Sequence, residues 1–382
     1  MQNVPLEGGP VRWVGAFDFD RRPTGLVPRR LPHWTRPQVP LFMEIVLTMP
    51  SGVRLEFATD SRTIEVDVLP TRIEIARPPL PAAFDLVVDG EPARIVTTES
   101  GDRLKIDLRD RGKATRARGE AGTVRFADLR PGLKQCELWL PANAIVEMRG
   151  LRVDDGATIE PKRARQRRTW LHHGSSISHC MEASSPTQTW PAVAARLADV
   201  ELLNLGLGGN CHLDQFVART MRDERADVLS LKVGINVVNA DSLKERTFAP
   251  ALHGFIDTIR ESKPNTPFLI ASPIFCPSAE ERPGPTIPNA AGEFVTLPGH
   301  DEVRAGSLTL VQMRAIIRDV VEVRRKHGDA NLHYLDGLEL FGAADVADLP
   351  DHLHPNNAGY GRMGQRFHAA AFAAGKPLAG SA

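Results

Sequence analysis

The first 155 residues alternate between hydrophobic and polar positions in short runs separated by turn-forming residues. A period of two is typical of half-buried strands, and repeated strands of this kind favour an antiparallel β-sandwich or jelly roll. Two of the separating turn pairs are Asp89-Gly90 and Pro131-Gly132. We expect no helix of normal length in this half. The strand-like runs are MEIVLTMP, SGVRLEFATD, TIEVDVLPTRIEIA, FDLVVDGEPARIV, RLKIDLRD, TVRFADL and CELWLPANAIVEMRGLRV.

The pattern changes at residue 169, where apolar strand-like runs begin to alternate with segments of helical period. Five strands alternating with helices predict a parallel sheet covered by helices on both faces. The chain is therefore expected to have an N-terminal domain at residues 1–160 and a second domain at residues 169–382. The five strand-like runs are TWLHHG, VELLNLG, DVLSLKVG, PFLIASPI and NLHYLDG, and the helical segments are TWPAVAARLA, LDQFVARTMRDE, FAPALHGFIDTIRES, LTLVQMRAIIRDVVEVRRKHG and AGYGRMGQRFHAAAFA.

Composition narrows the function classes. The chain has 382 residues, of which 42% are hydrophobic and 25% charged, and its 47 basic residues balance its 47 acidic ones. The chain therefore has no overall excess of positive charge that would favour binding to nucleic acid. The N-terminus has no signal-peptide pattern, and no run reaches the ~18 apolar residues of a membrane helix. We expect a cytoplasmic protein with no membrane span and no nucleic-acid partner. The basic segment PKRARQRR, residues 161–168, is interpreted as a solvated linker, with a nucleic-acid or localisation patch as the alternative.

Chemistry is expected where the strands end, because parallel sheets bind ligands beyond the carboxyl ends of their strands. The first strand is followed by Gly174-Ser175-Ser176, a turn that lets a hydroxyl project, although such turns also simply cap helices. The second is followed by the glycine-rich segment 204–210. This segment suits close approach of the backbone to a ligand, and a flexible turn or a phosphate cradle is the alternative. A dinucleotide site would need an acidic residue ending the next strand, whereas Asp223 and Glu224 lie on a predicted helix.

Candidate polar side chains also follow the third and the fifth strand. The third strand is followed by an amide, and the fifth by a carboxylate and an imidazole. Asn236 follows the third strand, where its side chain can donate to an oxyanion or form a local Asx-turn. Asp351 lies three residues before His354. This spacing can bring the carboxylate to the imidazole Nδ1 and leave Nε2 free as a base. A capping aspartate with surface histidines, or a metal site, are the alternatives.

Taken together and in this order, the four segments resemble the SGNH hydrolases, also called the GDSL esterase family. GSSIS is similar to the first block of that family, NLGLGGN to the second, GIN to the third and DHLHP to the fifth, over residues 169 to about 375. The resemblance implies a flavodoxin-like three-layer α/β/α domain with a five-stranded parallel sheet. The N-terminal half resembles the β-rich domains fused to some carbohydrate esterases.

The resemblance also assigns roles to individual residues. Ser176 would be the nucleophile, His354 the general base and Asp351 the residue that orients it. The oxyanion hole would consist of the Ser176 amide, the Gly209 amide and the Asn236 side chain. No metal and no cofactor would be required.

Two positions depart from the family pattern. Ser175 replaces the usual aspartate of the first block, and Val237 replaces the aspartate that usually follows the asparagine of the third. Ser175 is therefore a rival nucleophile, and a binding module with a decayed site is the alternative to an enzyme.

Two further features carry hypotheses of their own. Soft ligands on the loops after the strands would suit zinc, although their spacing matches no known metal pattern. These ligands are His179, Cys180, Cys211, His212 and Cys276. The proline-rich segment 273–307 is long for a connection and follows the fourth strand. We expect it to form a partial lid over an acyl or alcohol pocket, with a mobile insertion as the alternative.

The expected function is that of a serine esterase acting on a small-molecule substrate. It would cleave a small or polar acyl ester, with a sugar-linked ester as one option, through an acyl-enzyme intermediate. An acyltransferase using the same site is the alternative. The N-terminal domain would favour a sugar ester, or it would be a packing or oligomerisation module, which leaves a homo-oligomer open.

Overall fold

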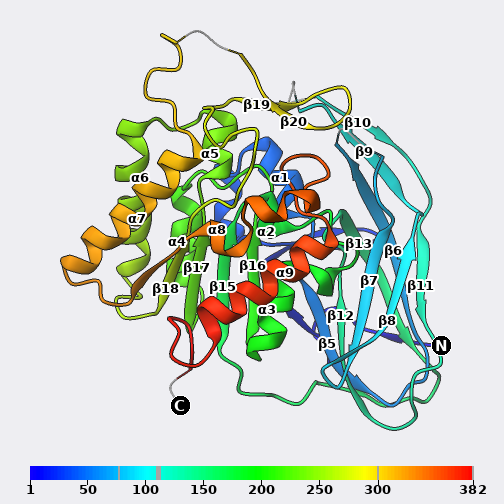
Figure 1. The fold of residues 1–382 in the computed structure, drawn as a ribbon. Helices are drawn as coiled ribbons and strands as arrows, with labels where there is room; N and C mark the ends of the chain where they lie inside the picture. Colours follow the sequence, from blue (N-terminus) through cyan, green and yellow to red (C-terminus); the bar gives the residue numbers. More distant parts are fainter. Residues whose placement is uncertain (76–77, 109–112, 299–300, 381–382) are drawn as a thin grey trace. The chain divides into compact units, whose positions relative to one another are not determined.

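The computed structural model describes residues 1–75, 78–108, 113–298 and 301–380 (Figure 1). The chain divides into two compact units. Unit 1 contains Met1–Gln166 and Met181–Gln188, and unit 2 contains Arg167–Cys180 and Thr189–Ala382. Within the described ranges, no helix is both long enough and apolar enough to cross a membrane.

Unit 1 consists mainly of two β-sheets. In the larger sheet the order is β10-β9-β6-β13-β4-β3, with β1 and β11 pairing off this path, and in the smaller it is β14-β5-β12-β7-β8, with β2 beside β5. All of these pairs are antiparallel except β6 with β9. The expected antiparallel β-rich half is therefore confirmed. The strands are β1 (Gln2–Val4), β2 (Arg12–Val14), β3 (Asp18–Arg22), β4 (Gly25–Arg29), β5 (Arg54–Thr59), β6 (Ile64–Glu74), β7 (Ala82–Val88), β8 (Glu91–Thr98), β9 (Asp102–Ile106), β10 (Ala114–Ala117), β11 (Gly122–Phe126), β12 (Lys134–Trp139), β13 (Ala144–Val153) and β14 (Ile159–Glu160).

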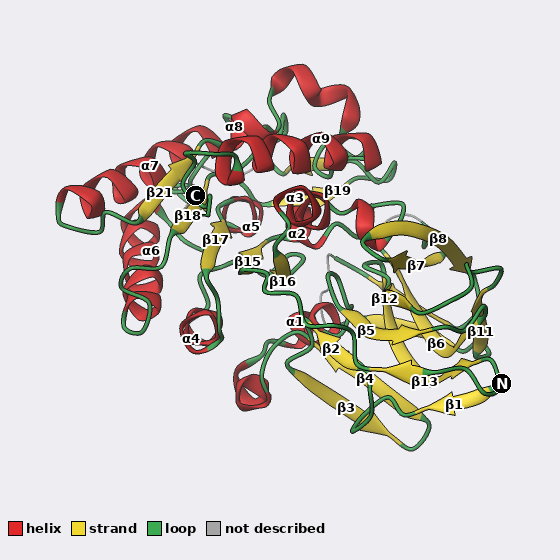
Figure 2. Ribbon diagram, turned by 90° about the horizontal axis from the view of Figure 1, so that it is seen from below, coloured by secondary structure: helices red, strands yellow, loops and turns green. Residues whose placement is uncertain are grey.

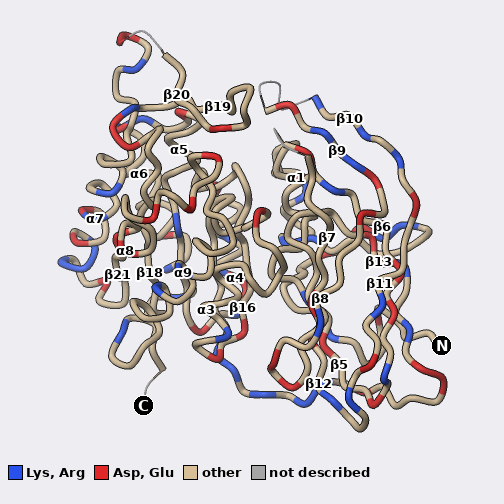
Figure 3. The backbone as a smooth tube through the Cα atoms, turned by 45° about the vertical axis from the view of Figure 1, so that its right-hand side comes forward, with Lys and Arg blue, Asp and Glu red and all other residues tan. Residues whose placement is uncertain are grey.

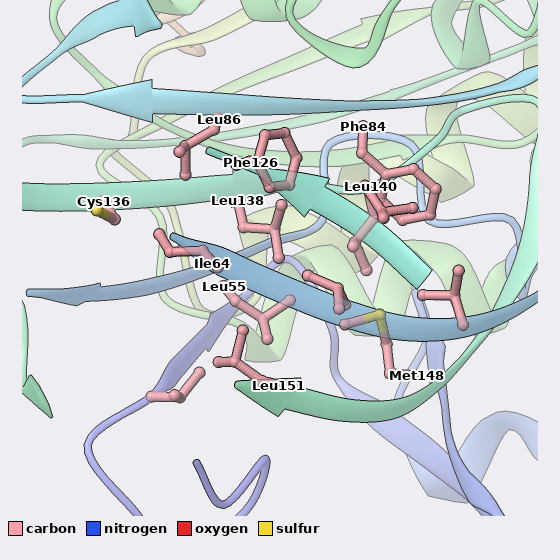
Figure 4. Close-up of a cluster of buried hydrophobic side chains, with 14 of the residues drawn as sticks. Leu55, Ile64, Phe84, Leu86, Phe126, Cys136, Leu138, Leu140, Met148 and Leu151 are labelled. Atoms are coloured by element: carbon pink, nitrogen blue, oxygen red, sulfur yellow. The ribbon is translucent and has the colours of Figure 1, made fainter. Parts of the chain in front are cut away.

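The core of unit 1 follows directly from the alternating pattern. Along β6, Ile64, Val66 and Val68 are fully buried while the residues between them are partly exposed. These side chains join buried residues of the second sheet, including Leu55 and Leu138 (Figure 4). Because successive side chains of a strand point to opposite faces, the period of two in the sequence marks this buried face.

One expected strand is a helix. The run MEIVLTMP overlaps α1 (Leu41–Leu47), which follows a 3₁₀ helix at His33–Gln38. Met43, Val46 and Leu47 are buried, a spacing of three and four residues that suits a helix face. Thr48 ends the helix, and its hydroxyl donates to the Ile45 carbonyl at 2.8 Å. A short apolar run fits either element by period alone, and here the helix prevails.

A short segment of unit 1, residues 181–188, lies in the sequence between two stretches of unit 2. Residues 181–188 follow the helix that bears Ser176 and end in the 3₁₀ helix Pro186–Gln188. The buried carboxylate of Asp85 on β7 fixes this segment. Its Oδ2 accepts hydrogen bonds from Ser185 Oγ at 2.7 Å, Thr187 N at 2.9 Å and Thr187 Oγ1 at 2.6 Å.

Unit 2 contains a five-stranded parallel sheet of order β16-β15-β17-β18-β21. Numbered along the chain, this is the 2-1-3-4-5 order of flavodoxin-like folds, as expected. Helices α3 and α9 pack against each other on one side of the sheet, and α4 and α6 on the other (Figure 2). The strands are β15 (Thr169–Gly174), β16 (Glu201–Gly206), β17 (Val228–Lys232), β18 (Phe268–Ala271) and β21 (Leu332–Leu335). The α-helices are α2 (Ser176–His179), α3 (Trp190–Ala198), α4 (Gln215–Asp223), α5 (Ile235–Ala240), α6 (Glu245–Arg260), α7 (Leu310–Lys326), α8 (Gly337–Leu340) and α9 (Asn357–Phe367).

Acidic and basic residues are interspersed along the chain (Figure 3). The basic segment 161–168 spans the boundary between the two units, and its side chains form ion pairs with acidic residues of the unit to which each belongs. Lys162 forms ion pairs with Glu56, at 3.5 Å, and with Glu137. Arg167 pairs with Asp199 at 2.9 Å. These ion pairs support the interpretation of the segment as a linker.

Candidate active site

The candidate nucleophile begins a short helix at the end of the first strand of the sheet. β15 ends at Gly174, and Ser175 is the N-cap of α2, with its Oγ accepting a hydrogen bond from Ile177 N at 3.3 Å. Ser175 is fully buried, whereas Ser176 is partly exposed. The Ser175 hydroxyl therefore caps the helix in the interior, and Ser176 is the more exposed of the two serines.

Ser176, His354 and Asp351 form a continuous hydrogen-bonded chain. His354 Nε2 lies 2.9 Å from Ser176 Oγ, and His354 Nδ1 lies 2.7 Å from Asp351 Oδ2. Asp351 Oδ1 accepts from the backbone N–H groups of Leu353 at 3.0 Å and His354 at 2.6 Å. An ionised Asp351 requires the imidazole proton on Nδ1, which leaves the Nε2 lone pair directed at the serine hydroxyl.

Asp351 is held in its ionised form. Burial raises the pKa of a carboxyl group, but the charge of His354 and the hydrogen bonds from His354 and Leu353 outweigh this effect and lower the pKa of Asp351 to about 2. The sequence places this loop after the fifth strand. In the structure α8 and a 3₁₀ helix at Ala343–Asp348 lie between β21 and Asp351.

The glycine-rich loop after β16 lies against the nucleophile. A Cβ added at Gly208 would be 3.6 Å from Ser176 Cβ, so the Gly208 backbone is a close neighbour of the serine. Gly209 has a φ of 70°, in the left-handed region that favours glycine. The His212 ring connects Ser242 Oγ, at 2.8 Å from Nδ1, with the Gly209 carbonyl, at 3.1 Å from Nε2. The His212 side chain therefore links the loop at Gly209 to Ser242.

Asn236 is the second residue of α5, and its side chain reaches the glycine-rich loop. Its Oδ1 accepts from the backbone N–H of Cys211 at 3.0 Å. The alternative of a local Asx-turn does not describe this bond, which joins residues 25 positions apart. Val237, the second departure from the family pattern, is fully buried in the same helix and contributes to the core.

Unit 2 contains a second serine–histidine pair, which sequence reasoning did not single out. His172 Nε2 lies 2.8 Å from Ser178 Oγ, and its Nδ1 lies 2.7 Å from Ser230 Oγ. All three residues are buried, and burial holds the pKa of His172 well below its usual value. This neutral imidazole joins two hydroxyls of the core and is out of reach of a substrate. In the sequence, His172 is marked only by its position within an apolar strand-like run, which does not indicate the pairing with Ser178.

The thiols proposed as zinc ligands lie in the interior. Cys180, Cys211 and Cys276 are buried, and burial raises the pKa of Cys211 and Cys276. No group of three or more His, Cys, Asp or Glu side chains in the described ranges is arranged to hold a metal ion. Lys232, at the end of β17, is buried in this region, and burial lowers its pKa to about 8.

Known proteins resemble this chain in sequence and in fold. The sequence model of the GDSL-like lipase/acylhydrolase family matches residues 173–362. Among solved structures, the salicylyl-acyltransferase SsfX3 from a tetracycline biosynthetic pathway has 30% sequence identity and a TM-score of 0.79, with 96% of this chain and 95% of that chain covered. The chain belongs to the GDSL-like lipase/acylhydrolase family. As a member, it is an enzyme of the carboxylic ester hydrolase class.

Two more distant structures share the fold across both halves of this GDSL-family chain. A putative GDSL-like lipase from Bacteroides ovatus has 19% identity and a TM-score of 0.67, with 94% of each chain covered. A family two carbohydrate esterase from Clostridium thermocellum, solved as an active site mutant, has 15% identity and a TM-score of 0.59, with 94% of this chain and 96% of that chain covered. The search of curated protein sequences found no match.

Proposed function

We propose that this GDSL-family enzyme is a serine esterase that works through an acyl-enzyme on Ser176. The observation that carries the proposal is the pair of distances around one imidazole, 2.9 Å from His354 Nε2 to Ser176 Oγ and 2.7 Å from His354 Nδ1 to Asp351 Oδ2. A nucleophile, a base and a residue that orients the base are the three parts such chemistry requires.

In the acylation step, Ser176 Oγ bonds to the ester carbonyl carbon while His354 Nε2 takes the hydroxyl proton. The tetrahedral intermediate then loses the alcohol, whose oxygen receives that proton from His354. The negative carbonyl oxygen is stabilised by the backbone N–H groups of Ser176 and Gly209 and by the Asn236 amide. In deacylation, water gives its proton to His354, attacks the acyl carbon, and releases the acid and the free serine.

All the residues with proposed roles lie in residues 169–382, so in this proposal the second domain performs the chemistry. The N-terminal domain, residues 1–160, contributes none of them. The substrate class proposed is a small or polar acyl ester. A neutral ester suits a chain with no net charge, and the fold shared with carbohydrate esterases supports a sugar-linked alcohol.

Acyl transfer to an alcohol or amine is the second candidate. It is favoured by the 30% identity over nearly the whole chain with an enzyme described as a salicylyl-acyltransferase. The acyl-enzyme is the same in both reactions, and only the group that attacks it differs. Product analysis with added alcohols distinguishes them, because transfer produces a new ester at the expense of free acid.

The test of the nucleophile compares two adjacent serines. Wild type is expected to hydrolyse p-nitrophenyl acetate and to be labelled by a fluorophosphonate, and Ser176→Ala is expected to lose the labelling and nearly all of the rate. Ser175→Ala is the matched control. It removes a helix cap, at a cost of about 1 kcal/mol in stability, but keeps the nucleophile. A labelled and active Ser176→Ala enzyme would reject the proposal.

A further inference from the structure

The long segment 273–307 contains a two-stranded hairpin that contacts the loop of Asp351 and His354. The strands are β19 (Thr286–Pro288) and β20 (Phe294–Thr296), labelled in Figure 1. The backbone N–H of Phe294 donates to the Asp351 carbonyl at 2.9 Å. The rings of Phe294 and His354 pack edge to face, with centroids 5.4 Å apart and an angle of 79° between planes.

The hairpin is fixed at several points within unit 2. Leu297 N donates to the Pro285 carbonyl at 3.0 Å, and Thr296 Oγ1 donates to the Ser278 carbonyl. Cys276 Sγ donates to the His352 carbonyl at 3.2 Å. A Cβ added at Gly284 would overlap the carbonyl oxygen of Val238 in α5, the helix of Asn236. The ring of Phe294 is therefore held at a defined place beside the imidazole.

The chemistry of ester cleavage defines which part of a substrate this ring meets. The imidazole that takes the serine proton must return it to the leaving alcohol oxygen, so the alcohol lies beside His354. The oxyanion donors hold the carbonyl oxygen at a separate position. Phe294 is partly exposed while His354 is buried, so the ring presents apolar surface next to the place of the alcohol.

We propose that Phe294 is a specificity-determining residue. It selects substrates in which the alcohol of the ester, or the acceptor in acyl transfer, carries an apolar ring face close to the reacting oxygen. This inference rests on the proposed function and adds the alcohol side of the substrate to it. An aromatic ring and the C–H face of a pyranose share this chemistry, since both pack against an aromatic side chain. The acyl group lies outside the reach of this selection.

The experiment uses three acetate esters, so that the acyl-enzyme is always the same. Butyl acetate has no ring, benzyl acetate has an aromatic ring, and methyl 6-O-acetylglucopyranoside has a pyranose. Phe294→Leu is expected to lower kcat/KM for at least one ring ester by roughly 3- to 10-fold relative to butyl acetate, the range of an aromatic contact. Whether benzyl or sugar acetate falls distinguishes the two sources of the ring.

The controls separate selection from structural damage. Phe294→Tyr keeps the ring and is expected to keep the wild-type preference. Val295→Ala changes the next residue, which points to the opposite face of the hairpin, and is expected to leave the ratios unchanged. Because the three esters form the same acetyl-enzyme, its rate of hydrolysis is expected to be the same for all three within each variant, so differences in kcat/KM between the esters report on the alcohol alone.

Two outcomes overturn the inference. An equal loss for all three esters would make Phe294 a support for His354 without selectivity, and no loss would remove the residue from the site. Failure of the proposed function is distinguishable from both, because wild-type Ser176 would then resist the fluorophosphonate and no acetate would be hydrolysed.

Discussion

The side-chain oxygen of Asn236 accepts a hydrogen bond from the backbone N–H of Cys211 at 3.0 Å. This bond fixes which end of the amide is which, because the oxygen is already engaged as an acceptor. The NH₂ group is then the end that can donate to a substrate oxygen. The same bond joins α5 to the glycine-rich loop, so one residue links the two segments that are proposed to form the oxyanion hole.

Removing this amide is expected to slow the chemistry more than it weakens substrate binding. Loss of one oxyanion donor typically lowers kcat by 10²–10³. Asn236→Ala is therefore expected to show a fall of this size in kcat on p-nitrophenyl acetate, with a smaller change in KM. Asn239→Ala, in the same helix, is the control and is expected to stay close to wild type. A kcat for Asn236→Ala within threefold of wild type would contradict the role.

Replacing the carboxylate of Asp351 by an amide is expected to misdirect the imidazole. In serine, histidine and aspartate triads this change favours the wrong tautomer and lowers kcat by about 10⁴ while the geometry stays intact. Asp351→Asn is expected to lose between about 10³ and 10⁴ in kcat. Thermal unfolding of the variant checks that it is folded, and a loss below tenfold would argue that the carboxylate is not required.

Lys232 is expected to make the folded protein more stable as the pH rises. A lysine paired with a carboxylate has the opposite effect. Burial lowers its folded pKa from 10.5 to about 8, so between these values the unfolded chain binds more protons than the folded one. Its destabilising effect is full below pH 8 and is relieved as the pH rises toward 10.5. The free energy of unfolding of wild type is expected to gain about 2 kcal/mol relative to Lys232→Met between pH 8 and pH 10.

This comparison is measured by urea unfolding of both proteins at several pH values. Lys232→Met is also expected to be the more stable protein at pH 7, because it removes a buried charge and keeps an unbranched side chain of similar length. Parallel curves for the two proteins would show that the lysine has an ordinary pKa.

Asp85 is expected to stabilise the segment 181–188. Its Oδ2 accepts three hydrogen bonds from Ser185 and Thr187, and bonds to charged groups contribute about 1.5–3 kcal/mol each when removed singly. Asp85→Ala is expected to lower the free energy of unfolding of the full chain by at least about 2 kcal/mol. Ser185→Ala removes one donor and is expected to cost less. Equal stability of Asp85→Ala and wild type would show that this carboxylate does not hold the segment.

The hydrophobic pattern predicted most of the elements, and its failure at MEIVLTMP has a simple cause. The strands of both halves either are apolar throughout or alternate between apolar and polar residues. Both patterns can be recognised in the sequence without knowing what the strand packs against. In the eight residues of MEIVLTMP the apolar side chains suit a helix face as well as a strand, and packing of Met43 and Val46 in the folded unit decided for α1. The order of strand-end motifs likewise predicted the family, which the comparisons confirm.

Sequence by itself determined the two periods, the strand ends and the candidate residues Ser176, Asn236, Asp351 and His354, because each of these depends on local spacing or on a recognisable motif. Tertiary structure alone decided the orientation of the Asn236 amide, the partner of Asp85, and the contact of Phe294 with His354. Those features join residues 25, about 100 and 60 positions apart, through a loop, a segment and a hairpin whose places are set by packing elsewhere in the fold. No local period records such contacts, since they depend on where irregular chain is anchored.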